Sequence, residues 1–272
     1  MMMDDLEDLT TWQAMGHPEL SERKPEELFN ADFAERYRQL HRILYERVIR
    51  LHGTIHTLEQ LEEFPFGYIY GPRDNEFWRL VFENFFDAAC LKLHGLATDR
   101  GSAVHNVVSF KNKVIMGPWR DTRLHTLLKG TLRERKFDER AQSVATRIEA
   151  IRHTHIAHFL IDTNANDSLP HLEGVSLREV RHLFDAVHSL FGALSFGAAF
   201  VTLPGDLMPS TVGGKPTRTC LDTVLDAVLR DSPFVTRPER NGEFWSHIRK
   251  HIPQQRLDVM NTLRRRVGLS EA

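Results

Sequence analysis

The sequence predicts an all-α protein, an antiparallel helical bundle with a C-terminal helical extension. Three observations support this fold class. Apolar residues recur every three or four positions in most segments, few segments alternate with a period of two, and no strand–turn–strand pattern is present. The 272 residues are 41% hydrophobic and 26% charged, which is typical of a globular protein and excludes a disordered chain.

The chain divides into four predicted regions. Residues 1–30 carry eight acidic and two basic side chains, a net charge of −6, and we expect a poorly ordered or loosely docked acidic N-terminal arm. Residues 31–203 form the helical bundle. Residues 204–218 contain a proline- and glycine-rich stretch and are predicted to be a loop or linker, and residues 219–272 form the helical extension.

Caps and apolar spacing predict the individual helices. Asn30 is a favourable N-cap, and the apolar spacing that follows it predicts a long helix ending at Gly53, with a short helix or turn at 55–64. Ser176 to Glu179 has the pattern of a capping box, which predicts a helix start. Further helices are predicted at 75–97, 104–115, 121–134, 138–162, 176–200, 220–229 and 243–267.

The composition also excludes several classes of function. The net charge of −2 excludes binding of nucleic acid or membranes by overall charge, so any such contact needs a local basic patch. The two cysteines, Cys90 and Cys220, can form neither a disulfide framework nor a four-cysteine zinc site. The N-terminus lacks a signal pattern, and the most apolar stretch, residues 190–203, is too short to span a membrane, so we expect a cytoplasmic protein.

The residues most able to carry chemistry lie near the end of the predicted helix at 138–162. Arg152, His153, His155 and His158 place one guanidinium and three imidazoles within seven residues. One interpretation is structural, because cationic side chains near the C-terminal end of a helix interact favourably with its dipole. A second is a metal site, because His155 and His158 lie on neighbouring positions of one helical face, with Asp162 the one acidic ligand close by.

The third interpretation is cleavage of RNA without a metal or cofactor. RNA carries its own nucleophile, the 2′-hydroxyl group, and an imidazole can remove its proton or protonate the leaving 5′-oxygen. A guanidinium can bind the phosphate and stabilise the charge that develops on its oxygens. Two copies of the helix that meet across a twofold axis would complete such a site.

The spacing Arg152-His153, four residues, His158 resembles the R-polar-x4-H signature of HEPN-superfamily ribonucleases. The segment from Ile148 to His158 is similar to the motif helix of abortive-infection-type HEPN proteins, as is the earlier helix that begins at Phe77-Trp78. The resemblance covers roughly residues 31–200. It implies a HEPN-like bundle and a homodimer whose two motif helices face each other and form a metal-independent RNA endonuclease site.

The resemblance also implies roles for individual residues. Arg152 would stabilise the phosphate, His158 would act as general acid or base, and His153 would orient the phosphate or His158. His155 lies outside the signature and is a secondary candidate for RNA contact. Asp87, among apolar residues of the earlier helix, is a candidate to orient a histidine of the motif helix.

The resemblance further implies a toxin or antiphage-defence effector of the abortive-infection kind. Such proteins are sometimes restrained by a nucleotidyltransferase antitoxin, which makes an antitoxin a candidate partner. The alternative is a catalytically silent HEPN-like module that binds RNA, a nucleotide or a protein partner.

A second candidate for RNA contact lies in the extension. Arg264, Arg265 and Arg266 close residues 230–266, which carry nine basic and four acidic side chains, a net charge of +5. Such a segment can follow an RNA backbone. It can equally be a solvated helix end that complements the helix dipole.

Overall fold

The computed structural model confirms the all-α fold class. It describes residues 17–64, 66, 76–97, 106–152, 175–197, 211–212, 215–216, 220–236 and 254–270. The chain forms two compact units. The first unit consists of Met1–Glu59 with Glu83–Leu203, and the second consists of Gln60–Phe82 with Pro204–Ala272. The expected division at 203/204 thus separates the units, but residues 60–82 belong with the C-terminal extension rather than with the bundle.

Part of the predicted acidic arm is helical and buried. Residues 17–30 contain two single-turn helices, α2 (Pro18–Ser21) and α3 (Pro25–Leu28), and the expectation of a loose arm is wrong for them. Leu20, Leu28 and Phe29 are buried, and burial of these apolar side chains attaches the segment to the first unit. Residues 1–16 lie outside the described part of the chain.

The longest helix, α4 (Ala31–Glu63), passes through Gly53, where the sequence analysis placed its end. A glycine inside a helix costs about 1 kcal/mol relative to alanine. Ile55 and Leu58 are fully buried on the same face as Leu51, and their burial outweighs that cost. The predicted short element at 55–64 is therefore the end of α4.

The remaining helices of the first unit begin where local caps place them. The side chains of Asn106, Asp121 and Ser176 accept hydrogen bonds from backbone amides of the first turns of α7, α8 and α10. The bounds are α6 (Glu76–Ala97), α7 (Val107–Ile115), α8 (Thr122–Glu134), α9 (Phe137–Arg152) and α10 (Leu177–Gly192).

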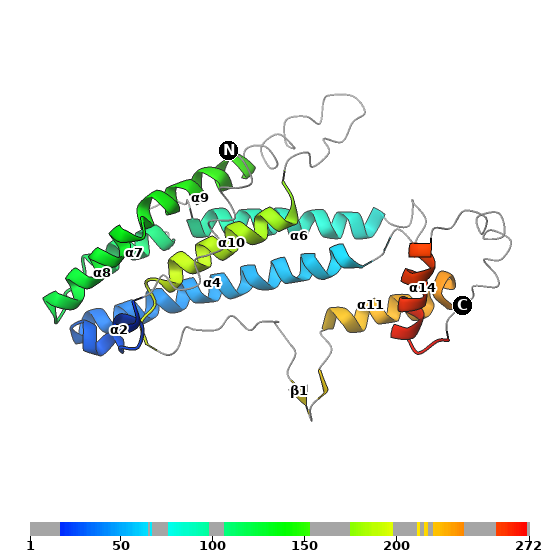
Figure 1. The fold of residues 1–272 in the computed structure, drawn as a ribbon, viewed down its shortest axis with the longest axis horizontal. Helices are drawn as coiled ribbons and strands as arrows, with labels where there is room; N and C mark the ends of the chain where they lie inside the picture. Colours follow the sequence, from blue (N-terminus) through cyan, green and yellow to red (C-terminus); the bar gives the residue numbers. More distant parts are fainter. Residues whose placement is uncertain are drawn as a thin grey trace. The chain divides into compact units, whose positions relative to one another are not determined.

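The helix α10 lies antiparallel to α4, and Figure 1 shows the two side by side. Near the start of α4 the Tyr37 hydroxyl group donates a hydrogen bond to the carbonyl of Leu194, and near its end Glu59 pairs with Arg181. α10 ends at Gly192 rather than near 200. Tyr37 also accepts a hydrogen bond from the amide of Phe196, so the residues after α10 bond to α4 instead of extending their own helix.

The second unit packs three helices of the extension around a small apolar core. They are α11 (Cys220–Asp231), α12 (Pro233–Thr236) and α14 (Gln254–Arg266). The linker contains a two-residue antiparallel hairpin, β1 (Thr211–Val212) with β2 (Lys215–Pro216). The buried core of this unit consists of Phe64, Leu225, Leu229, Val235 and Leu263.

Within the described part of the chain, no helix combines the length and apolar character needed to cross a membrane.

Candidate functional site

Arg152 is the last residue of α9, and the helix places it in solvent. Val144, Ile148 and Ile151 recur at helical spacing and are buried, which fixes the face of α9 that packs on the unit. Arg152 follows Ile151 and is exposed. The guanidinium that the signature singles out is therefore accessible to a ligand.

The guanidinium of Arg152 contacts a histidine that the sequence analysis did not select. Its Nη1 lies 3.2 Å from Nε2 of His94, in the last turn of α6. A guanidinium has only donors, so in this hydrogen bond Nε2 of His94 is the acceptor and carries no proton. The contact places an imidazole nitrogen with a lone pair directly beside an exposed cation.

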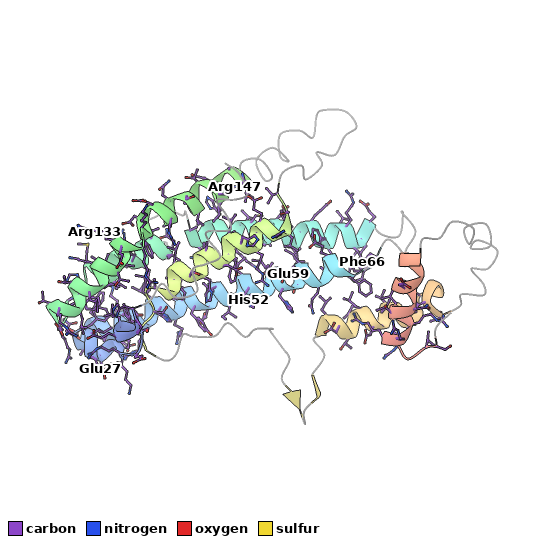
Figure 2. The ribbon with its side chains drawn as sticks, viewed as in Figure 1. Glu27, His52, Glu59, Phe66, Arg133 and Arg147 are labelled. Carbon is purple, nitrogen blue, oxygen red and sulfur yellow. The ribbon has the colours of Figure 1, made fainter. Side chains whose placement is uncertain are left out.

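An ion pair positions the end of α9 against the start of α10. Arg147 donates from Nε to Glu179, whose side chain is only 10% exposed. Figure 2 labels Arg147 on the last turns of α9. Because the pair joins helices 32 residues apart in the chain, it limits where Arg152, five residues further on, can lie.

The other residues of the motif lie outside the described part of the chain. This holds for His153, His155 and His158, whose assigned roles stay predictions. Asp87 is described and exposed, seven residues before His94 on the same face of α6, or about 10 Å along the axis. Asp87 lies three residues before Cys90 on α6, and its charge adds to burial in raising the pKa of the Cys90 thiol.

The three arginines of the extension have different surroundings. Arg264 is buried and donates from Nη1 to the carbonyl of Val235 at 2.5 Å and from Nε to that of Ser270 at 2.6 Å. Arg266 pairs with Asp226 and Asp222. Arg264 therefore does not present its charge to an RNA strand, and Arg266 is held by carboxylates. Arg265 is exposed, and its contact with RNA stays a prediction.

A second polar cluster, also missed by the sequence analysis, links α4 to α10. Glu59 accepts two hydrogen bonds from Arg181, at 2.8 and 2.6 Å, and His56 Nδ1 lies 3.9 Å from the same carboxylate. Burial, with a smaller contribution from His52, lowers the pKa of His188 to about 4. Figure 2 labels His52 and Glu59 along α4. The pair of Glu59 and Arg181 thus joins α4 to α10, and His56 adds a contact to the same carboxylate from within α4.

No cluster of metal-ligating side chains occurs among the described residues. Among residues 17–64, 66, 76–97, 106–152, 175–197, 220–236 and 254–270, no group of three or more histidine, cysteine, aspartate or glutamate side chains is arranged to hold one. The pair His155 and His158 lies outside these ranges.

Comparison with known proteins finds no relative of this chain. No protein-family model, no curated protein and no solved structure matches it. The candidate site therefore depends on the chemistry and geometry of its own residues.

Proposed function

We propose that the chain is a metal-independent RNA endonuclease of the HEPN type that acts through Arg152 and the histidines around it. The observation that carries the proposal is the contact between the exposed Arg152 guanidinium and the His94 imidazole. The contact holds an exposed cation that can bind a phosphate at the end of the helix that leads into the motif histidines. A guanidinium that binds the phosphate and an imidazole that accepts or supplies a proton are the groups that cleavage of RNA requires.

The reaction is an intramolecular transesterification. The 2′-oxygen of the ribose forms a bond to the adjacent phosphorus while the bond from phosphorus to the 5′-oxygen of the next nucleotide breaks. A base removes the proton of the 2′-hydroxyl group, and an acid supplies one to the leaving 5′-oxygen. The products are a 2′,3′-cyclic phosphate and a 5′-hydroxyl end, and water is not consumed.

The residues have distinct roles in this reaction. Arg152 binds the phosphate and stabilises the negative charge that grows on its oxygens in the transition state. His158 is the general acid or base, and His153 orients the phosphate or His158. His94 accepts a hydrogen bond from the guanidinium of Arg152 and so fixes the position of that group at the C-terminal end of α9. A homodimer that brings two copies of this helix end together would supply both an acid and a base.

The test is cleavage of single-stranded RNA by the purified full-length chain in the presence of EDTA. We expect cleavage that leaves 2′,3′-cyclic phosphate ends and stops when the ribose at the cleaved position is replaced by 2′-deoxyribose. Arg152→Ala and His158→Ala should each lower the rate by at least about 100-fold while the circular dichroism spectrum is unchanged.

Arg133→Ala is the matched control for Arg152→Ala. Arg133 is an exposed arginine on α8, outside the candidate site, and its removal should leave the rate unchanged. Cleavage that requires a divalent cation would overturn the proposal in favour of a metal site. RNA binding without cleavage, unchanged in His158→Ala, would instead identify a catalytically silent binding module.

A further inference from the structure

The exposed face of α8 carries a shallow groove. Its volume is about 630 Å³, and it is lined by residues of α8 and by His17, which precedes α2. Leu127 and the methyl groups of three threonines make the lining largely apolar, and Arg123 and Glu134 are the charged residues of α8 in it. The volume lies within the range of roughly 300–1,000 Å³ that is typical of ligand pockets. The groove therefore has room for side chains that come from elsewhere.

The groove is open at Gly130. At two other glycines a Cβ would collide with a neighbouring side chain: with Nη2 of Arg47 at 2.7 Å at Gly95, and with the ring of Phe33 at Gly117. At Gly130 a Cβ would meet no atom of the described residues within 4 Å. A glycine inside a helix is destabilising relative to alanine, and no described neighbour uses the space that this one leaves. That space is therefore open to a side chain from outside the described part of the chain.

The chain is fixed against α8 at the point where residues 1–16 are attached. Nδ1 of His17 accepts a hydrogen bond from the amide of Glu19 at 3.3 Å, which caps α2. The Glu19 carboxylate pairs with Arg123 in the first turn of α8, and Leu20 is buried. Because His17 also lines the groove, residue 16 is attached at the edge of the groove.

Residues 1–16 and α8 are complementary in charge. Residues 1–16 carry four carboxylates and no cation, a net charge of −4, whereas residues 122–136 carry five basic side chains and one acidic one, a net charge of +4. Lys129 is exposed and lies three residues after Thr126 of the groove, and no carboxylate of α8 lies three or four residues from it. An acidic ligand in the groove thus has a cation at its edge, and the one carboxylate it meets on α8 is that of Glu134.

Residues 1–16 also have apolar side chains that suit the lining of the groove. These side chains recur at every third position: Leu6, Leu9, Trp12 and Met15. Their transfer from water to an apolar surface favours association. Sixteen residues span roughly 50 Å when extended and roughly 24 Å as a helix, and the 13 residues of α8 span about 20 Å. The segment is therefore long enough to follow the whole groove.

Attachment at His17 favours this segment over a separate molecule. A ligand on a short covalent link has an effective concentration on the order of 1 mM, so it outcompetes the same segment of a second copy at ordinary protein concentrations. A strand of RNA is disfavoured by the apolar lining and by Glu134, because a chain of phosphates needs cations along the surface.

We propose that residues 1–16 bind in the α8 groove of the same chain. Their apolar side chains lie against Leu127 and Gly130, and their carboxylates lie near Lys129. The groove is thus an interaction surface for an acidic peptide with regularly spaced apolar side chains. This inference is independent of the proposed ribonuclease function.

Fluorine NMR of the full-length chain labelled with 5-fluorotryptophan tests the proposal. The chain has four tryptophans, and Trp12 is the one within residues 1–16. Its line is identified by its loss in Trp12→Phe. In the wild type we expect this line away from the position that it has in a synthetic peptide of residues 1–16, because the docked ring is removed from water.

Gly130→Leu fills the groove without removing a charge. The added side chain enters open space, and leucine is a better helix former than glycine, so the fold should persist. Docking should weaken at least about tenfold, which moves the Trp12 line toward the free-peptide position. The Trp119 line should stay in place, because Trp119 stacks on His125 of α8 at 5.3 Å and so reports the local fold. Thr146→Leu, at an exposed position of α9 outside the groove, is the matched control and should leave the Trp12 line unchanged.

Lys129→Glu tests the charge complementarity. Reversal of one exposed charge should weaken docking about fivefold and move the Trp12 line part of the way toward the free-peptide position. Arg42→Glu makes the same change in net charge at an exposed position of α4, outside the groove, and should leave the Trp12 line in place.

Three results would overturn the inference. A wild-type Trp12 line at the free-peptide position would show that the segment does not dock, and if Gly130→Leu then weakened binding of a 2′-O-methylated RNA, the groove would hold RNA instead. A shifted Trp12 line that Gly130→Leu leaves unchanged would place the segment elsewhere. A Trp12 shift that grows with protein concentration would show docking on a second copy. Cleavage of RNA enters none of these measurements, so failure of the proposed function would leave their outcome unchanged.

Discussion

The imidazole of His41 lies 2.9 Å from the hydroxyl group of Ser195, which is 154 residues later in the chain. Ser195 donates its own proton to the carbonyl of Phe191, so it accepts a hydrogen bond from Nε2 of His41. His41 stacks on the ring of Phe191, and burial lowers its pKa from 6.5 to about 4. The neutral imidazole is thus part of the interface between α4 and α10.

The first prediction concerns stability at acidic pH. Between pH 6.5 and about 4 the unfolded chain binds protons at His41 and His188 that the folded chain does not, so the free energy of unfolding falls as the pH falls. Each histidine contributes up to about 3 kcal/mol across that window. Urea denaturation at a series of pH values above about 5 measures the slope.

Variants identify the groups responsible. His41→Gln and His188→Gln should each flatten the pH dependence, because a glutamine does not titrate. Burial raises the pKa of Asp185, and this carboxyl acts in the opposite direction, so the two histidines are identified by comparing each variant with the wild type. Slopes that are the same in both variants and in the wild type would contradict the assignment.

The second prediction concerns the hydroxyl group of Tyr37. In Tyr37→Phe the carbonyl of Leu194 and the amide of Phe196 lose their partner in a buried position, which should cost about 3 kcal/mol of unfolding free energy. Tyr45→Phe is the matched control on the same helix. Tyr45 is only half-buried, and its variant should lose less than about 1 kcal/mol. Equal losses of unfolding free energy in the two variants would show that the hydrogen bonds of Tyr37 with Leu194 and Phe196 do not stabilise the fold.

The third prediction compares two ion pairs by double-mutant cycles. Arg147 and Glu179 pair across α9 and α10, and the Glu179 side chain is nearly buried, so their coupling energy should exceed about 1 kcal/mol. Arg38 and Glu35 pair on the exposed surface of α4, and theirs should stay below about 0.5 kcal/mol. Chemical denaturation of the variants measures both values, and a reversed order would contradict the positioning role given to Arg147.

The fourth prediction separates the consecutive arginines of α14. Arg264→Ala leaves two carbonyls without their buried donor and should lower the free energy of unfolding by about 2 kcal/mol. Arg265→Ala changes an exposed side chain and should stay within about 0.5 kcal/mol of the wild type. The Tm of the full chain reports the difference. Equal Tm values would show that the bonds of Arg264 do not stabilise the second unit.

Some helix starts could be predicted from the sequence because their causes are local. Asp121 and Ser176 accept hydrogen bonds from amides two or three residues further on, so cap and helix occur together in the chain. The start expected at 104 is wrong, because Asn106 is the cap and α7 begins at Val107. The ends of α4 and α10 could not be predicted. They depend on burial of Ile55 and on the hydroxyl group of Tyr37, which belong to contacts with distant segments.

One residue of the candidate site could be predicted from the sequence, and another could not. Arg152 could be found from its spacing to His158, which the sequence displays directly. His94 lies 58 residues away from Arg152, and no spacing in the sequence relates the two. Arg264 and Arg265 are alike in the sequence and differ only because α14 turns one inward and the other outward.

The sequence by itself thus determined the all-α class, the helix starts at Asp121 and Ser176 and an arginine-histidine motif, since these arise from interactions within a few residues. The tertiary structure alone decided which histidine contacts Arg152, which arginines are buried and where Gly95 admits Arg47. The physical reason is that burial and hydrogen bonds between helices depend on segments that are distant in the chain and meet only when it folds.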